Sequence, residues 1–210
     1  MVDACFCHQL LRPSVLVLAQ AGVPEQYSEE DARAWLARRP AFRSIAITIL
    51  HDLEDLNSKK LAECGGICIS GGNTFNLLNR LRRSGRSDVL LSAVQRGFPV
   101  YGMSAGAAIM GHDIAVAASI PEADPNDVGL DDFHALNLAN GWNICCHYLP
   151  EWAPLLRQEV ARSGRNIIAI PDASGVFFDG TAPRVIGPDP VTLLTAEVVM
   201  TLPAGSRLNL

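Results

Sequence analysis

A serine stands between two glycines in the middle of the chain, in the sequence Gly-Met-Ser-Ala-Gly at residues 102–106. The pattern Gly-x-Ser-x-Gly forms a sharp strand-to-helix turn in hydrolases and leaves the serine hydroxyl exposed for attack on a carbonyl carbon. Here a β-rich run at 98–103 precedes the serine and an Ala-rich helical run at 105–110 follows it. Ser104 is therefore the candidate nucleophile, and an ordinary glycine-flanked turn is the alternative.

A second glycine-rich turn, Ser-Gly-Gly-Asn-Thr at 70–74, also lies between a predicted strand and a predicted helix. Such turns gather at one edge of a parallel sheet. The backbone N–H groups of Gly72 and Ala105 are candidates for an oxyanion hole, and Asn73 and Thr74 are candidates for contacts with the substrate. A phosphate loop is the alternative, but the chain lacks both the G-x-x-x-x-G-K-[ST] and the G-x-G-x-x-G patterns.

A serine nucleophile needs a general base. His147 directly follows a predicted strand at 142–146, which is where a catalytic loop would begin. His51 also ends a predicted strand and is the alternative. Two further histidines lie in polar surroundings, where we expect them to be solvated at the surface: His112 and His134.

The third partner of such a site is a carboxylate that orients the imidazole. Asp172 fits this role, because it follows a predicted strand at 166–170. Asp113, Glu122 and Asp124 are alternatives, although acidic loop residues are ordinarily solvated.

Short β-branched runs alternate with amphipathic helical stretches, which predicts an α/β fold with a mainly parallel sheet. Strands are expected at 14–18, 44–50, 66–69, 98–103, 114–118, 142–146 and 166–170. Four later segments, at 175–178, 184–186, 191–194 and 198–202, are expected to form an antiparallel C-terminal appendage. The acidic stretch 121–132 is expected to be a surface loop.

Helices are predicted at 74–83, 87–96, 105–110 and 152–162. A further helix should follow a turn at 22–26, begin with a capping box at Ser28 and Asp31, and end at Pro40. Its expected apolar face consists of Ala32, Trp35 and Leu36. Another predicted helix carries Leu53, Leu56 and Leu61.

Length and composition indicate one core-rich domain spanning residues 1–210. Hydrophobic residues make up 49% and charged residues 19% of the chain. The net charge of −5 argues against nucleic acid or an anionic membrane as the partner. No apolar run approaches the roughly 20 residues of a membrane helix, and no secretory signal is visible, so we expect a soluble cytoplasmic protein with a small partner.

Six cysteines occur without any C-x-x-C spacing, and we interpret them as small buried hydrophobes. Cys5, Cys7 and His8 could hold a soft metal, but this pattern lacks a second pair of ligands. We therefore expect no metal site.

Three motifs together are similar to the peptidase E family of serine peptidases. They are Gly-Gly-Asn-Thr-Phe at 71–75, Gly-Met-Ser-Ala-Gly-Ala at 102–107, and Ala-Leu-Asn-Leu at 135–138 with His147 beyond it. That family comprises aspartyl dipeptidases and the related cyanophycinases. The resemblance covers about residues 13–178 and implies a three-layer α/β/α, flavodoxin-like fold akin to class I glutamine amidotransferases.

The resemblance also implies roles for individual residues. Ser104 would be the nucleophile and His147 the general base, while Gly72 and Ala105 would supply the oxyanion N–H groups. Asp172, after Pro171, matches the position of the family's acid, with Asp in place of Glu. The implied substrate is a small peptide, no metal or organic cofactor is needed, and the protein would be a monomer or a homodimer.

Some features depart from the family pattern. Twelve residues before Pro13 are too few for its opening strand and helix. The stretch between His147 and Asp172 is shorter than in aspartyl dipeptidases and contains no Gly-Glu-Thr-Arg-like segment for an acidic substrate side chain, so the resemblance does not extend to a preference for Asp-X peptides.

The leading hypothesis is a dipeptidase-like serine peptidase that uses Ser104, His147 and Asp172 and forms an acyl-enzyme. A catalytically idle ligand-binding member of the same fold is one alternative. An α/β-hydrolase esterase is another, but esterases place the acid before the histidine, and here the order is reversed.

Overall fold

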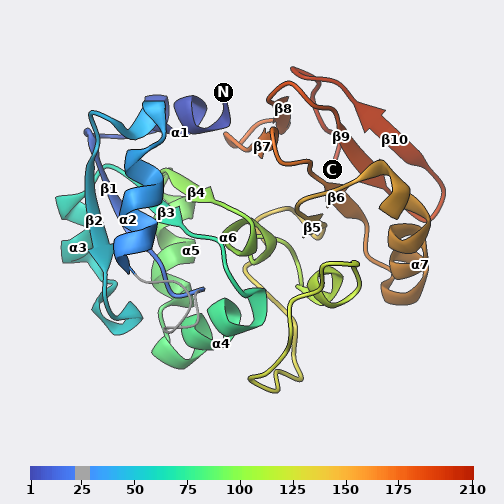
Figure 1. Cartoon of the computed structure of the whole chain (residues 1–210), viewed down its shortest axis with the longest axis horizontal. Coiled ribbons are helices and arrows are strands. Elements are labelled where there is room, and N and C mark those ends of the chain that lie inside the picture. The colour runs from blue at the N-terminus through green and yellow to red at the C-terminus, as the bar shows by residue number, and fades with distance from the viewer. Residues whose placement is uncertain (22–28) are drawn as a thin grey trace. The chain divides into compact units, whose positions relative to one another are not determined.

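The computed structural model describes residues 1–21 and 29–210 (Figure 1). Contacts divide these residues into two compact units. The N-terminal unit holds Asp3–Ala107 and Asn126–Leu130, and the C-terminal unit holds Met1–Val2, Ala108–Pro125 and Asp131–Leu210. The single domain expected from the sequence remains a prediction. The expected turn at 22–26 and the capping residue Ser28 lie outside the described residues.

A four-stranded parallel sheet forms the centre of the N-terminal unit, in the order β2-β1-β3-β4. Its strands are β1 (Ser14–Leu18), β2 (Ala46–Leu50), β3 (Ile67–Ile69) and β4 (Val100–Gly102). Four successive residues of β1 and all three of β3 are buried. Continuous apolar runs of this kind arise because helices cover both faces of a parallel sheet.

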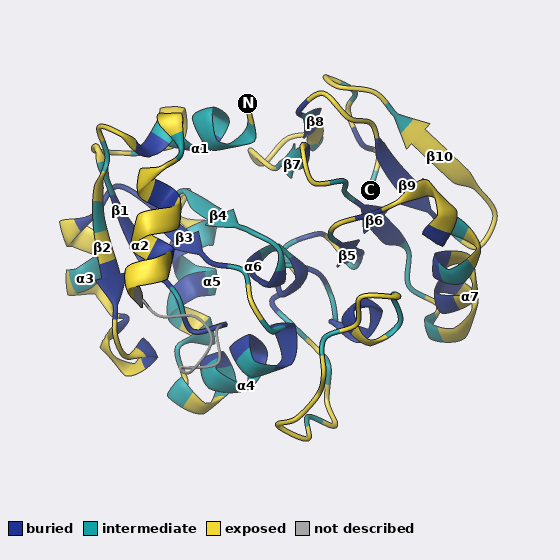
Figure 2. Ribbon diagram, viewed as in Figure 1, coloured by how far each residue is buried: buried dark blue, intermediate teal, exposed yellow. Residues whose placement is uncertain are grey.

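Two helices cover one face of this sheet, α1 (Val2–Gln9) and α2 (Glu29–Ala37). Phe6 of α1 and Leu36 of α2 pack with Val15 and Val17 of β1. Figure 1 shows α5 (Ser87–Gln95) behind the sheet, with α3 (Ser58–Glu63) and α4 (Thr74–Ser84) also in this unit. Figure 2 shows buried residues in β1 and β3 and on parts of the surrounding helices, whereas β4 is intermediate and β2 is partly exposed.

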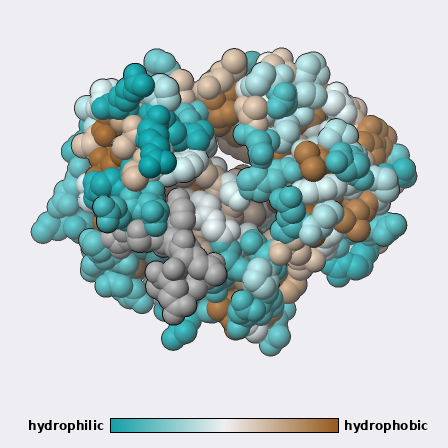
Figure 3. Space-filling model, viewed as in Figure 1, coloured by the Kyte–Doolittle hydropathy of each residue, from teal (hydrophilic) through white to brown (hydrophobic). Residues whose placement is uncertain are grey.

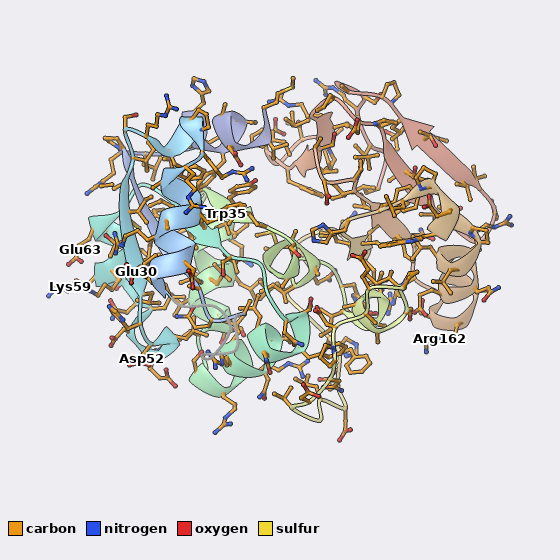
Figure 4. All side chains as sticks on the ribbon, in the orientation of Figure 1. Glu30, Trp35, Asp52, Lys59, Glu63 and Arg162 are labelled. Atoms are coloured by element: carbon orange, nitrogen blue, oxygen red, sulfur yellow. The ribbon has the colours of Figure 1, made fainter. Side chains whose placement is uncertain are left out.

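The apolar face of α2 is narrower than the sequence predicted. Ala32 and Leu36 are buried, but Trp35 is 39% exposed. Figure 4 labels Trp35 on α2. The guanidinium carbon of Arg39 lies 4.2 Å from the centre of the Trp35 ring, so this ring packs against a cation and not in the core.

The single helix expected around Leu53, Leu56 and Leu61 is wrong. A 3-10 helix, η2 (Leu53–Asp55), is followed by the separate helix α3. The chain breaks there because Asn57 caps α3, with its side-chain oxygen accepting from the backbone N–H groups of Lys59 and Lys60. A second 3-10 helix, η1 (Pro40–Phe42), follows α2.

The C-terminal unit contains a mixed four-stranded sheet in the order β10-β9-β6-β5. Its strands are β5 (Asn143–Cys145), β6 (Ile167–Ala169), β9 (Val191–Leu194) and β10 (Val199–Leu202), while β7 (Gly175–Phe177) and β8 (Arg184–Ile186) form a separate antiparallel pair. The strands β5 and β6 are parallel, and β9 is antiparallel to β6 and β10. The expected C-terminal strands are therefore present and antiparallel, and two of them extend the β5–β6 sheet.

One helix forms the core of this unit with the sheet. Leu156 and Val160 of α7 (Ala153–Ser163) pack against Cys145 of β5 and Ile167 of β6. Trp152, at the end of the short helix η4 (Pro150–Trp152), belongs to the same cluster. On the visible face of each unit, hydrophilic side chains dominate and apolar ones form small, separate patches (Figure 3).

The strand expected at 114–118 is wrong, because residues Ala115–Ala118 form a 3-10 helix, η3. The carboxylate of Asp113 accepts from the backbone N–H of Ala115, and the N–H of Ala117 bonds to the carbonyl of Ile114. These local bonds compete with strand pairing. Residues 121–132 form neither helix nor strand and are mostly exposed, as predicted.

The four parallel strands of the N-terminal unit and the parallel pair β5–β6 confirm the α/β fold with a mainly parallel central sheet. Among the helices that the structure describes, none is long and apolar enough to cross a membrane. All six cysteines are free thiols, and Cys64, Cys68 and Cys145 are buried. The described side chains include no group of three metal-ligating residues.

Candidate active site

Ser104 occupies a strained backbone position directly after β4 and before α6 (Ala105–Ala108). Its φ of 50° lies in the left-handed region, which costs a residue with a side chain about 1–2 kcal/mol. The turn is closed by bonds from the N–H of Gly106 to the carbonyl of Met103 and from the N–H of Ala107 to the carbonyl of Ser104. Backbone strain of this kind concentrates at functional sites.

Close backbone packing explains the two glycines that flank the serine. A Cβ on Gly102 would lie 2.4 Å from the carbonyl oxygen of Gly106. A Cβ on Gly106 would lie 2.3 Å from the carbonyl oxygen of Ile69, at the end of the neighbouring strand β3. Both separations are far below van der Waals contact, so this turn requires glycine at both positions.

The second glycine turn lies beside Ser104 in the same unit. A Cβ built on Gly71 would be 3.1 Å from Cβ and 3.7 Å from Oγ of Ser104. Gly72 has a φ of 137°, and a Cβ there would be 2.6 Å from the carbonyl oxygen of Ala21. Glycine at these positions therefore allows the turn to pass close to the serine.

Asn73 and Thr74 begin helix α4. The side-chain oxygen of Asn73 accepts from the N–H of Asn76 at 2.8 Å and so caps the helix. Thr74 is only 3% exposed. Their expected contact with substrate remains a prediction, and the structure adds a capping role for Asn73.

In the C-terminal unit, a bulge in the β5–β6 ladder presents His147. The N–H of Ile170 bonds to the carbonyl of Cys145 at 2.8 Å, and the N–H of Tyr148 bonds to the carbonyl of Ile170 at 3.1 Å. A regular parallel ladder would use the N–H one residue earlier, so this strand contains one extra residue. His147 has a φ of 57°, and bulges of this kind re-aim side chains near active sites.

The same bulge explains why His147 meets Asp172. Asp172 follows Ile170 by two residues, and its Oδ1 lies 2.5 Å from Nδ1 of His147. The side chains of His147 and Asp172 are 49% and 79% exposed, respectively. The contact with the carboxylate engages Nδ1, which fixes the orientation of the imidazole.

The alternative acids have other surroundings. Asp113 bonds to Asn143 and to the N–H of Ala115. Asp124 is tied through its backbone N–H to the carbonyl of Ala117, and Glu122 is exposed. Asp172 is thus the sequence candidate that the described hydrogen bonds join to His147.

Cys146, next to His147, is held in its neutral form. Burial, and then the nearby charges of Asp172 and Asp124, raise the pKa of its thiol to about 12. A thiol is nucleophilic only as thiolate, so Cys146 is unsuited to act as the nucleophile near neutral pH.

The expectation of a solvated His112 ring is wrong. Both of its ring nitrogens are buried, and neither has a hydrogen-bond partner in the described part of the chain. Its ring meets that of His134 edge-on, with centres 5.3 Å apart. His134 is 71% exposed and pairs with Asp132, whose Oδ1 is 2.7 Å from its Nδ1. The prediction relied on the polar residues next to His112 in the sequence. It failed because the backbone N–H of His112 bonds to the carbonyl of Trp142, which holds His112 beside β5.

Two features near His147 were not anticipated from the sequence. One is its left-handed backbone, for which no glycine or asparagine gave a signal. The other is Asn143 in β5, which is fully buried. An amide inside an otherwise apolar strand is a usable signal, because a buried polar group needs a partner.

The fold and the strained turn at Ser104 define a class of α/β proteins whose candidate nucleophile is a serine between a strand and a helix. Within that class, the chain belongs to peptidase family S51, whose family model matches residues 12–186. This membership confirms the resemblance drawn from the sequence motifs.

Curated relatives support the same family. Peptidase E of Shewanella denitrificans is 31% identical over 154 residues, which are 69% of this chain and 63% of that protein. Peptidase E of Pasteurella multocida is 27% identical over 205 residues, which are 92% of this chain and 83% of that protein. The match therefore spans less than two thirds of the Shewanella protein.

Solved structures share the fold. A peptidase from an acI-B1 Actinobacterium has a TM-score of 0.69 and 18% identity, covering 100% of this chain and 90% of its own. A Listeria monocytogenes EGD-e protein has a TM-score of 0.68 and 23% identity, covering 88% of this chain and 92% of its own. At these identities the likeness shows the fold alone.

Proposed function

We propose that this protein is a serine peptidase that hydrolyses small peptides through an acyl-enzyme. The observation that carries the proposal is the hydrogen-bonded pair of His147 and Asp172 at the end of β5. It is supported by the strained turn at Ser104 and by membership of peptidase family S51.

The first half of the reaction forms the acyl-enzyme. Oγ of Ser104 attacks the peptide carbonyl carbon while Nε2 of His147 takes the hydroxyl proton, giving a tetrahedral oxyanion and an imidazolium. Asp172 stabilises the imidazolium through Nδ1. The C–N bond then breaks, His147 gives its proton to the leaving amine, and an ester on Ser104 remains.

The second half releases the acid. A water molecule attacks the ester carbonyl as His147 accepts one of its protons. The second tetrahedral intermediate collapses, the bond to Ser104 Oγ breaks, and the proton on His147 returns to Oγ. Each turnover consumes one water and leaves the three side chains unchanged.

The oxyanion of both intermediates would be stabilised by the N–H groups of Gly72 and Ala105. The placement of Gly71 beside Ser104 Oγ supports this assignment. Asn73 and Thr74, at the start of α4, would contact the substrate. None of these steps requires a metal or an organic cofactor.

We infer short peptides, dipeptides among them, as the substrate class, on the strength of the curated relatives named peptidase E. A preference for N-terminal Asp is not part of the proposal, because the chain lacks a Gly-Glu-Thr-Arg-like segment. The cytoplasm is the expected location.

The direct test compares the parent protein with Ser104→Ala on a dipeptide library and with a fluorophosphonate probe, which labels activated serines. We expect labelling and turnover to be lost in Ser104→Ala. Ser92→Ala is the matched control, since the hydroxyl of Ser92, on α5, accepts a hydrogen bond from the side chain of Arg96, and this variant should keep both activities. Equal labelling of Ser104→Ala and the parent would overturn the proposal, as would peptide-induced thermal stabilisation without any turnover.

A further inference from the structure

A short segment that follows α6 contacts β5, the strand that precedes His147. After α6, residues 109–114 of the C-terminal unit run next to β5. The N–H of His112 donates to the carbonyl of Trp142 at 2.9 Å. A Cβ on Gly111 would lie 3.1 Å from the backbone nitrogen of Ile144, so the two backbones are nearly in contact.

Two side chains lock this contact. Oδ1 of Asn143 accepts from the backbone N–H of Asp113 at 3.0 Å, and Nδ2 of Asn143 donates to Oδ1 of Asp113 at 2.9 Å. Asn143 is fully buried, so water cannot replace these bonds. Asp113 Oδ1 also accepts from the N–H of Ala115, which begins η3.

The other side of the segment is held by the Ala-Leu-Asn-Leu motif. The N–H groups of Leu136, Asn137 and Leu138 donate to the carbonyls of Ile109, Gly111 and Met110 at 2.8–2.9 Å. Carbonyl groups at the end of a helix lack intrahelical partners. Here the N–H groups of the Ala-Leu-Asn-Leu motif donate to the carbonyl groups that directly follow α6. The segment after the nucleophile helix is therefore fixed from both sides.

We propose that Asp113 and Asn143 are positioning residues for the peptidase reaction. Neither is proposed to touch substrate. Their reciprocal hydrogen bonds hold residues 109–114, which follow α6, on β5 at Asn143, four residues before His147. The inference rests on the proposed function, because it assigns the pair a part in the reaction of Ser104.

Asp113→Ser and Asp113→Asn separate this role from the hydrogen bond that Asp113 accepts from the N–H of Ala115 in η3. A serine hydroxyl can still accept from the N–H of Ala115 but is too short to reach Asn143. Asparagine keeps an oxygen for both donors and should restore the pair. Ser119→Ala is the matched control, because it removes a hydrogen bond to the buried Glu159 in the same unit.

The experiment measures the melting temperature, the rate of fluorophosphonate labelling of Ser104, the pH at which labelling is half-maximal, and kcat and KM. For Asp113→Ser we expect labelling and kcat to fall about tenfold to a hundredfold, a shifted half-maximal pH, and little change in KM. Asp113→Asn should stay within about twofold of the parent. Ser119→Ala should lower the melting temperature without slowing labelling.

A purely structural pair would give a different result. If Asp113→Ser melts earlier but its folded form is labelled as fast as the parent, the inference is overturned while the proposed function stands. If Asp113→Ser does not fold, the labelling rates of Asp113→Asn and Asn143→Ser decide the question. Asn143→Ser shortens the other partner of the hydrogen-bonded pair. Labelling of folded Asn143→Ser at the parent rate would also overturn the inference. Absence of labelling at Ser104 in the parent would overturn the proposed function and the inference together.

Discussion

Nδ1 of His147 lies 2.5 Å from Oδ1 of Asp172, although 25 residues separate the two along the chain. The contact depends on backbone geometry: Ile170 bonds to both Cys145 and Tyr148, and the extra residue between these two turns His147 toward the residues after β6. The pair forms within the C-terminal unit alone.

Replacing Asp172 should lower turnover without unfolding the protein. In Asp172→Asn we expect kcat to fall about a hundredfold, less than for a buried triad acid, because this carboxylate is 79% exposed. Asp172→Glu should keep kcat within about tenfold of the parent, since only one methylene is added. Steady-state kinetics on a cleaved dipeptide provide the measurement.

A second His–Asp pair offers the matched control for this prediction. Asp132 sits 2.7 Å from His134 in the same unit, and Asp132→Asn should leave kcat unchanged. If both Asp→Asn variants lowered kcat equally, a specific role for Asp172 would be wrong.

The left-handed backbone of His147 predicts an unusual order of stability. His147→Gly should be more stable than His147→Ala by about 1 kcal/mol, because glycine adopts a positive φ without steric cost. Urea unfolding of the two variants measures the difference. At His51, whose φ is not positive, alanine should be the more stable, because glycine adds freedom to the unfolded chain. The same order at both sites would contradict the prediction.

Gly71→Ala should impair the reaction more than the fold. The new Cβ would lie 3.1 Å from Cβ of Ser104, so we expect the serine to shift and kcat to fall by about tenfold or more. Gly175→Ala creates a similar crowding, 3.0 Å from a Val2 side-chain carbon, and should affect stability only. Kinetics and thermal melts of the pair distinguish the effects, and equal loss of kcat in both would count against the placement of Gly71.

We expect the free energy of unfolding to fall at alkaline pH, because folding raises the pKa of several thiols. The pKa of Cys146 is raised from 9.0 to about 12, so the folded state keeps its proton where the unfolded chain releases it. This contribution to stability is complete below pH 9 and declines as the pH rises toward 12. Burial also raises the pKa of Cys145 and Tyr101, so other groups add to the decline.

Cys146→Ala should therefore flatten the fall of the melting temperature between pH 9 and 12 without abolishing it. Melting curves at a series of pH values measure the slope. A slope identical to that of the parent would show that this thiol does not couple folding to pH.

Local patterns were sufficient for the features that depend on near neighbours in the chain. The apolar runs at β1 and β3, the helix α4, and the glycine-flanked turn at Ser104 could all be predicted, because hydrophobic periodicity and glycine act over a few residues. The same patterns failed at Trp35, where Arg39 covers the ring, and at Ala115–Ala118, where the side chain of Asp113 accepts from the first N–H of a 3-10 helix. Single side-chain contacts decided both cases.

By itself, the sequence determined which residues carry suitable chemistry: a serine between glycines, a histidine after one strand and an aspartate after another. Only the tertiary structure decided that His147 meets Asp172, that β9 joins β6, and that Asn143 is buried against Asp113. The physical reason is that residue type sets local backbone preference and reactivity, whereas these contacts depend on strand register and on hydrogen bonds between segments 23 to 30 residues apart.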